Sequence, residues 1–395
     1  MKEYYKYLVL VAIFTILLLV YGLASYSFSL FVNPIESELG WARSDIFLSL
    51  TVYNMVMICF LPFVGKAINY KGLKFILSIG TVAFGSGFLL LGLINSAWQF
   101  YIIWGLIGFG AAAIGLVPTT TLILTWFKKH TGLALGVMGA AVGTGGFIVA
   151  PIVGYLIPEI GWRNTYFVMG IFAILIICPL ALFILKTKPA DVKKGEASLT
   201  GLSLKEAKNT TAFWLMTGAF LLLGFSQMAI FMNHAPRLLD IGFTIGIAAS
   251  AISVVGFGSS FGKFFFGILC NWMNPKYVLT LAIVLEIAAV FILISIDKDS
   301  SLALIYLYSI LYGLGIGCWL PSIVMLTKNT FGLAHYSANY GVFFAVLIAG
   351  NSIGPYIASV MYGATNSYNS AFILILIAFV LAVAMVMFVR GQVKR

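Results

Sequence analysis

A lysine lies near the middle of a long apolar stretch, Gly246–Trp272, and is followed by three phenylalanines. An ionisable side chain inside a membrane segment costs about 3 kcal/mol on insertion scales, so it is kept where it faces a partner or a watery cavity. Helical spacing places Gly256, Ser259 and Gly267 on the same face as Lys263. The ammonium would therefore look out from a groove of small residues, where a small ligand fits.

The structural alternative is that Lys263 only reaches back to the membrane surface. It lies about eight residues, or ~12 Å at helical rise, from the charged end of its stretch. A lysine can bury its carbon stem along apolar surface over such a distance and keep its ammonium in water. The bulky phenylalanines directly after Lys263 favour the ligand-facing interpretation.

Glu286 is the only acidic residue deep in an apolar stretch. It follows Lys276 by about ten residues, or ~14 Å of helix, so its expected depth is close to that of Lys263. Our hypothesis is that a bound anion competes for the Lys263 ammonium while Glu286 takes up a proton. The alternative is a protonated Glu286 that faces a neighbouring helix or lipid.

The composition determines which elements must position these residues. Of 395 residues, 62% are hydrophobic and 9% are charged, which excludes a soluble globular protein. Runs of about twenty apolar residues are long enough to cross a bilayer. Twelve such runs are predicted, at residues 7–31, 44–65, 75–94, 100–125, 132–157, 164–185, 212–235, 247–271, 278–296, 302–326, 337–361 and 370–389.

The basic residues predict the orientation of these spans. Eighteen of the 23 Lys and Arg residues fall in segments on one side, Lys263 falls within a span, and four fall on the other side: Arg43, Arg163, Arg237 and Lys298. Because basic residues favour the cytoplasmic side, both termini are predicted to be cytoplasmic. The net charge of +11 is thus explained without nucleic acid, and Lys128 and Lys129 are placed to meet anionic lipid.

The chain divides into two halves that repeat each other. The long polar segment 186–210 separates a predicted six-helix bundle at 1–185 from a second at 211–395, and Ser203–Lys208 within it is expected to form a short helix. One offset of 202 residues relates Glu38 to Asp240, Gly40 to Gly242, Trp41 to Phe243, Gly65 to Gly267, Asn69 to Asn271 and Lys74 to Lys276. Such tandem repeats are typical of transporters that bind substrate between two halves.

Several motifs resemble those of a known family. The spacing of Gly65–Lys74 (GKAINYKGLK), echoed at Gly267–Lys276, is similar to the cytoplasmic loop signature of the major facilitator superfamily. Trp126–Gly146 is similar to the fifth-helix signature of its monocarboxylate transporter branch and of the oxalate/formate antiporters. Further agreement comes from four short segments: Gly40–Ile46 (GWARSDI), Gly161–Phe167 (GWRNTYF), His234–Gly242 (HAPRLLDIG) and Asn339–Gly341 (NYG). The resemblance implies an all-α membrane protein, with twelve helices in two pseudo-symmetric six-helix bundles.

The chain departs from the family pattern in ways that bear on its substrate. Asn69 and Asn271 stand where the loop signature usually has Asp, so a weaker latch between helices is expected around Gly65, Lys74, Gly267 and Lys276. Monocarboxylate transporters often carry an Arg in the eighth helix, where this chain has Lys263. The oxalate/formate antiporters add a Lys in the eleventh helix, near Val346 here. One intramembrane cation rather than two favours a monoanion over a dianion.

The candidate substrate-binding residues are Lys263 and polar or aromatic residues on other helices: Tyr26, Asn54, His234, Trp319 and Asn351. Lys263 supplies a positive charge with three hydrogen-bond donors, less selective in geometry than an Arg fork. The others have structural alternatives: packing or interface anchoring for Tyr and Trp, and a cap before Pro236 for His234.

These observations predict a secondary transporter for a small organic monoanion, coupled to protons through Glu286. The alternatives are an anion exchanger, a transporter-like sensor that signals without transport, and an exporter of amphiphiles. No catalytic motif is found, and His130, His234 and His335 are too far apart to share a metal. We therefore expect no enzyme activity, no cofactor and no metal, in a monomeric, multi-pass protein of the plasma (inner) membrane.

Overall fold

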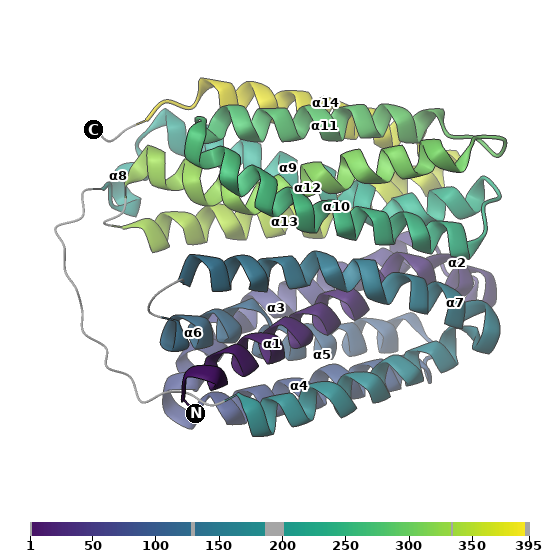
Figure 1. The fold of residues 1–395 in the computed structure, drawn as a ribbon. Helices are drawn as coiled ribbons and strands as arrows, with labels where there is room; N and C mark the ends of the chain where they lie inside the picture. The colour runs from purple at the N-terminus through teal and green to yellow at the C-terminus, as the bar shows by residue number, and fades with distance from the viewer. Residues whose placement is uncertain (1, 128–130, 186–200, 333–334, 392–395) are drawn as a thin grey trace. The chain divides into compact units, whose positions relative to one another are not determined.

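The computed structural model describes residues 2–127, 131–185, 201–332 and 335–391. Within these ranges the regular elements are helices, and one isolated bridge joins Gly201 to Gly332. The elements in chain order (Figure 1) are α1 (Lys2–Tyr21), η1 (Gly22–Tyr26), α2 (Phe28–Leu39), α3 (Arg43–Lys71), α4 (Leu73–Leu91), α5 (Ala97–Ile114), α6 (Leu116–Trp126), α7 (Thr131–Pro179), η2 (Leu180–Ile184), α8 (Leu204–Lys208), α9 (Thr211–Asp240), α10 (Ile245–Trp272), α11 (Pro275–Ser295), α12 (Leu302–Phe331), α13 (Tyr336–Thr365) and α14 (Asn369–Phe388).

The described residues contain eleven continuous helical stretches that are long and apolar enough to cross a membrane. One of them, Gly136–Ile184, is broken at Gly161, where φ is 80° and the backbone is not helical. A side chain would be strained at such a φ, so glycine suits this turn. Counting the two arms of α7 separately gives twelve spans, and the predicted all-α membrane fold is confirmed.

Three spans contain local departures from α-helix, one of which is the π-helix η2 at the end of the second arm of α7. In the first span, η1 is a short π-helix, and the hydroxyl of Ser27 donates to the carbonyl of Gly22 at 2.7 Å, as does its backbone N–H at 3.1 Å. Single-turn π-helices of this kind are frequent at functional sites. In the fourth span, α5 ends and α6 begins around Gly115, which has non-helical backbone angles.

Contacts between residues divide the chain into two units, and the boundaries between these units fall within α9 and within α10. Unit 1 comprises residues 1–191 and 235–257, and unit 2 comprises residues 192–234 and 258–395. In unit 1, α4 packs on α5 and α7, and α3 packs on α5. In unit 2, α11 packs on α12 and α14, and α12 packs on α13.

The bounds of the helices follow the offset of 202 residues found in the sequence. It relates Arg43, which begins α3, to Ile245, which begins α10, and Leu73, which begins α4, to Pro275, which begins α11. It also relates Gly40 to Gly242, which both follow a helix and both have positive φ, 68° and 102°. These two pairs of equivalent helices therefore begin at equivalent positions in the two halves.

The segment expected to be a cytoplasmic loop is mostly helical. Gly65 and Asn69 lie within α3, which extends to Lys71 and ends only at Gly72, whose φ is 82°. Gly267 and Asn271 lie within α10, while Lys74 and Lys276 lie in the first turns of α4 and α11. The apolar run predicted at 44–65 was therefore too short, because the helix continues past its apolar residues as far as the first residue with left-handed backbone.

The segment between the halves contains the short helix that the sequence predicted. α8 begins after Ser203, whose side chain accepts from the backbone N–H of Glu206 at 3.3 Å while the Glu206 carboxylate accepts from the Ser203 N–H at 2.8 Å. This reciprocal pair is a capping box. The remainder of the expected linker, residues 186–200, lies outside the described residues.

A group of charged side chains joins the ends of α2, α3 and α9 within unit 1. Arg43 donates through Nη1 and Nη2 to both carboxylate oxygens of Asp240, each at 2.6 Å, and through Nε to Glu36 at 2.8 Å. Asn33 also donates to Asp240, at 3.2 Å. The Arg43 side chain is only 5% exposed, so its charge depends on these two carboxylates.

Removing one carboxylate should therefore destabilise the protein. Asp240→Asn keeps the shape but leaves Arg43 with Glu36 as its charged partner, and we expect a loss of about 1–3 kcal/mol, below the 3–5 kcal/mol typical of fully buried pairs because Asp240 is partly exposed. Thermal unfolding in detergent measures this loss. The control is Asp45→Asn, an exposed residue in the first turn of α3, which should cost no more than about 1 kcal/mol. Equal shifts for the two variants would contradict the buried-pair argument.

A second ion pair links α2 to the second arm of α7 and should make stability depend on pH. Glu38 accepts from Arg163 at 2.9 Å and from Trp162, which lower its pKa below the ordinary value of 4.5. A lowered pKa contributes stability above the ordinary value, and this stability is lost as the pH falls through the lowered one. Glu38→Gln should therefore unfold more easily than the unmodified protein at pH 7, by at most about 1 kcal/mol at this exposed site. The difference should vanish under acid conditions, and a constant difference would contradict the assignment.

Candidate functional site

Lys263 lies in the second half of α10, within unit 2, and is partly buried. Its ammonium donates to the hydroxyl of Ser259, one turn earlier, at 3.1 Å. Within the described residues it forms no ion pair, since the three ion pairs found there are Arg43–Glu36, Arg43–Asp240 and Arg163–Glu38. The one strong partner of this charge is thus a neutral hydroxyl, which is consistent with a site that accepts an anion.

The helix that carries Lys263 is held against α12 by glycines. A Cβ added at Gly258 or Gly262 would meet the backbone of α12 at residues 313, 314 and 317, so the two backbones approach closely. Gly267, expected on the Lys263 face, faces Pro321 of α12. Gly256 packs on the backbone of α7 in unit 1. The expected small-residue groove is therefore occupied by neighbouring helices at both of these glycines.

Glu286 is fully buried in α11 and is bound by a residue that the sequence analysis did not identify. The amide of Gln227 in α9 donates to Glu286 Oε1 at 2.6 Å, and Gly315 of α12 lies directly against the Glu286 side chain. The second carboxyl oxygen, Oε2, is buried without a hydrogen bond in the described residues. Glu286 and Lys263 do not pair in this structure.

Gln227 is in turn fixed by Tyr312, whose hydroxyl donates to the Gln227 backbone carbonyl. The sequence carried a partial signal for this arrangement, because Gln227 lies seven residues before His234 and so on the same face of α9. What it could not show was that this face meets α11 and α12.

The other predicted residues divide between the two units. Tyr26 ends η1 and packs against Gly146 of α7, and Asn54 is buried in α3; both lie in unit 1. In unit 2, Trp319 of α12 stacks on Phe344 of α13, with ring centroids 6.2 Å apart, and Asn351 of α13 contacts α9 at Gly224.

A helix cap before Pro236 is the alternative role that the sequence allows for His234. The structure shows that His234 does not cap a helix. α9 continues through Pro236 to Asp240, and the His234 ring is fully buried inside it. The ring lies near the carbonyls of Ile230 and Phe231, but neither nitrogen completes a hydrogen bond of normal geometry in the described residues. Its ring centroid is 6.1 Å from that of Tyr308 in α12.

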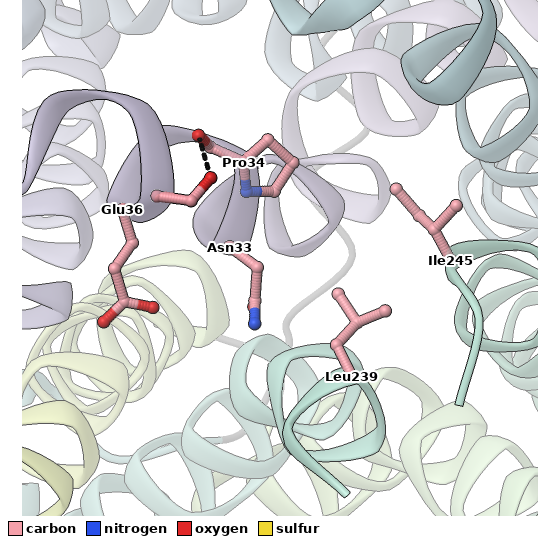
Figure 2. Close-up of a pocket in the computed structure, with 6 residues that line it drawn as sticks. Asn33, Pro34, Glu36, Leu239 and Ile245 are labelled. Carbon is pink, nitrogen blue, oxygen red and sulfur yellow. Dashed lines mark hydrogen bonds between the residues drawn. The ribbon is translucent and has the colours of Figure 1, made fainter. Parts of the chain in front are cut away.

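A separate cleft of about 520 Å³ opens in unit 1, next to the Arg43 group. Asn33, Pro34, Glu36 and Ser37 of α2 line one side, and Leu239 and Ile245 line the other. Figure 2 shows Asn33 and Leu239 extending toward the same space from α2 and α9. Its lining contains an acidic residue and no lysine or arginine, so an anion has no charged partner among the lining residues.

Comparisons with known proteins agree with this architecture. The profile of the Major Facilitator Superfamily matches residues 14–346 and 239–395. The chain is similar to the oxalate:formate antiporter of Oxalobacter formigenes, with 24% identity over 94% of this chain and 88% of the relative. It is also similar to human monocarboxylate transporter 12, with 24% identity over 81% of this chain and 68% of the relative, and to hamster (Mesocricetus auratus) monocarboxylate transporter 2, with 24% identity over 88% and 77%.

A solved structure has the same fold. A bacterial homologue of the human lysosomal transporter Spinster superposes with a TM-score of 0.72, covering 98% of this chain and 94% of that one at 16% identity. The profile match, the twelve spans and the repeated halves lead to one conclusion. The chain belongs to the Major Facilitator Superfamily and is a multi-pass membrane protein of the secondary transporter class.

Proposed function

We propose that this transporter moves a small organic monoanion, a monocarboxylate such as lactate, pyruvate or formate, by alternating access. The observation that carries the proposal is Lys263, a partly buried cation whose one strong partner within the described residues is the neutral Ser259 hydroxyl. Leaving a charge without a counter-ion in a low-dielectric setting is unfavourable. A carboxylate bound at the ammonium removes that penalty.

The charge that we propose for the substrate is inferred from the same site. One cation balances one negative charge, which favours a monoanion. The names of the relatives, an oxalate:formate antiporter and two monocarboxylate transporters, support carboxylates as the class. Within unit 2, Trp319 and Asn351 are the residues that we propose contact the rest of the substrate.

Glu286 is the proposed site of proton coupling. It is buried in the same unit as Lys263, is held through Oε1 alone, and keeps Oε2 without a hydrogen bond in the described residues. Taking up a proton would neutralise the carboxylate, while the substrate neutralises the ammonium. Proton and anion would then cross together as a neutral pair.

The proposed setting is the plasma (inner) membrane, with both termini in the cytoplasm, because the basic residues concentrate on that side. We propose that the transporter acts as a monomer, among lipids whose anionic head groups meet the basic segments. The main alternative is exchange of one anion for another, which the oxalate:formate antiporter name favours.

Replacing Lys263 tests the anion site. Lys263→Ala should reduce uptake of a labelled monocarboxylate into proteoliposomes by at least about thirtyfold, as expected for loss of one partner of a buried charge pair. Lys263→Arg should retain part of the activity because it retains the charge. The control is Lys298→Ala, an exposed lysine outside the helices. Full activity of Lys263→Ala would exclude the carboxylate proposal and favour an exporter, and absence of transport in the unmodified protein would favour a sensor.

Glu286→Gln separates symport from exchange. The variant keeps the shape but cannot take up a proton, so uptake driven by a pH gradient should fall by at least about tenfold. Exchange against unlabelled anion preloaded in the vesicles should continue, because that cycle needs no net proton movement. Unchanged gradient-driven uptake would remove Glu286 from the coupling mechanism.

A further inference from the structure

Unit 2 contains a file of buried polar side chains on the facing sides of α9, α11 and α12. Its members are His234 and Gln227 of α9, Tyr308 and Tyr312 of α12, and Glu286 of α11. Gln227 is 7% exposed and the other four are fully buried. We call these five residues the polar file. They lie among helices whose other buried side chains are largely apolar, so their grouping needs an explanation.

Each member of the file is next to another. The rings of His234 and Tyr308 are 6.1 Å apart between centroids, and those of Tyr308 and Tyr312 are stacked at 5.8 Å with an interplanar angle of 12°. The Tyr312 hydroxyl donates to the backbone carbonyl of Gln227, whose side chain donates to Glu286 Oε1 at 2.6 Å. The file is therefore continuous from His234 to Glu286.

The polar file also retains unused hydrogen-bonding groups. Both ring nitrogens of His234, the Tyr308 hydroxyl and Glu286 Oε2 make no hydrogen bond within the described residues. Buried groups of this kind are normally satisfied, because an unmade hydrogen bond is unfavourable. Imidazole, phenol and carboxyl groups share the ability to accept and release a proton.

The file runs along the helices in one direction. His234 lies six residues, or ~9 Å, from the Asp240 end of α9, and Gln227 lies seven residues, or ~10 Å, further in. Tyr308 is likewise six residues from the start of α12, and Glu286 is nine residues from the end of α11. Those three helix ends are on the side that the charge distribution assigns to the exterior. The file thus begins near the proposed outer surface and ends at Glu286.

We propose that the polar file carries protons between the exterior and Glu286. His234 accepts a proton on one nitrogen and releases one from the other, Tyr308 accepts and donates through its hydroxyl, and Glu286 Oε2 receives the proton and loses its charge. Tyr308 and Gly315, which contacts Glu286, lie two helical turns apart, or ~10 Å. The proposed route therefore includes water molecules between the Tyr308 hydroxyl and Oε2. Gln227 and Tyr312 are positioning residues, which hold Oε1 and leave Oε2 for the proton.

The surrounding helices bring few competing groups to Glu286. The ionisable side chains on the elements packed around Glu286 are His234, Arg237 and Asp240 of α9, Tyr306, Tyr308, Tyr312, Cys318 and Lys328 of α12, and Lys263 and Cys270 of α10, which packs on α12, while α14 has none from Asn369 to Phe388. Arg237, Asp240 and Lys328 lie within the last four residues of their helices. Lys263 forms no ion pair with Glu286, and Cys318 is in contact with the Ser322 hydroxyl at 2.9 Å. The histidine and tyrosines of the file are therefore the groups linked to the carboxyl by contacts.

The first test compares proton flux with anion exchange. This inference rests on the proposed coupling role of Glu286, so Glu286→Gln is measured beside Tyr308→Phe and His234→Gln. Tyr308→Phe keeps the ring and loses only the hydroxyl. We expect it to slow proton-driven monocarboxylate uptake at least about tenfold and to leave exchange against preloaded anion within about twofold. Tyr166→Phe is the control, since Tyr166 of α7 in unit 1 is equally buried, stacks on Phe31 and also has an unbonded hydroxyl.

The outcomes separate the two proposals. If Glu286→Gln loses proton-driven uptake while Tyr308→Phe and His234→Gln keep it, the file is not the route, although coupling through Glu286 stands. If Glu286→Gln keeps proton-driven uptake, coupling itself fails. If Tyr308→Phe loses exchange together with proton-driven uptake, the hydroxyl serves the whole transport cycle, and the proton-specific role is overturned.

A second measurement needs no substrate and covers the case in which no tested anion is moved. The infrared band of the protonated Glu286 carboxyl is identified, in an acid titration, by its loss in Glu286→Gln, and its rate of exchange is followed after transfer to heavy water. Tyr308→Phe should slow this exchange at least about tenfold, and Tyr166→Phe should not change it. Equal exchange rates in the two variants would overturn the route.

Discussion

The proposed site depends on one constraint, which is that the positive charge of Lys263 is held within the apolar helices α10 and α12. Lys263 is carried by α10, and glycines at positions 258 and 262 let that helix lie directly against the backbone of α12. A close backbone contact of this kind restricts how far the two helices can move apart without losing packing. The helix that carries Lys263 is therefore held firmly against α12. The one strong hydrogen bond of the Lys263 ammonium within the described residues is to the neighbouring Ser259.

Lys263 and Glu286 of unit 2 are kept apart, and each has a neutral partner. Lys263 donates to Ser259, and Glu286 accepts from Gln227. A direct ion pair would satisfy both charges at once and would leave neither available to a ligand. With separate neutral partners, the ammonium is stabilised by an added anion and the carboxylate by an added proton. This arrangement makes binding of the two species mutually supportive, because the anion or the proton alone would leave a net charge at the pair of groups, while the two together leave none.

Features that depend on the local sequence could be predicted, whereas features that depend on contacts between helices far apart in the chain could not. The twelve spans follow from local hydrophobicity, and the offset of 202 residues found in the sequence relates the starts of α3 and α4 to those of α10 and α11. The helical continuation of α3 to Lys71 did not follow, because the end of an apolar run is not the end of a helix. The partner of Glu286 also could not be predicted, since it depends on which faces of α9, α11 and α12 meet. For the same reason the Arg43–Asp240 contact could not be predicted, although both residues lie in segments that carry family motifs.

The repeat itself argues that packing alone does not explain the polar residues of unit 2. The offset of 202 residues relates Lys263 to Leu61, Glu286 to Phe84 and His234 to Val32, all apolar. Phe84 and Val32 are fully buried, and Phe84 packs against Phe88 and the backbone of α5 near Gly110. The first half thus closes equivalent helix contacts with hydrocarbon, which has no desolvation penalty. The second half has the same helical plan and accepts that penalty at three positions. If stability alone were required, apolar residues at these three positions would serve it better. The ionisable residues Lys263, Glu286 and His234 therefore point to transport chemistry located in the second half.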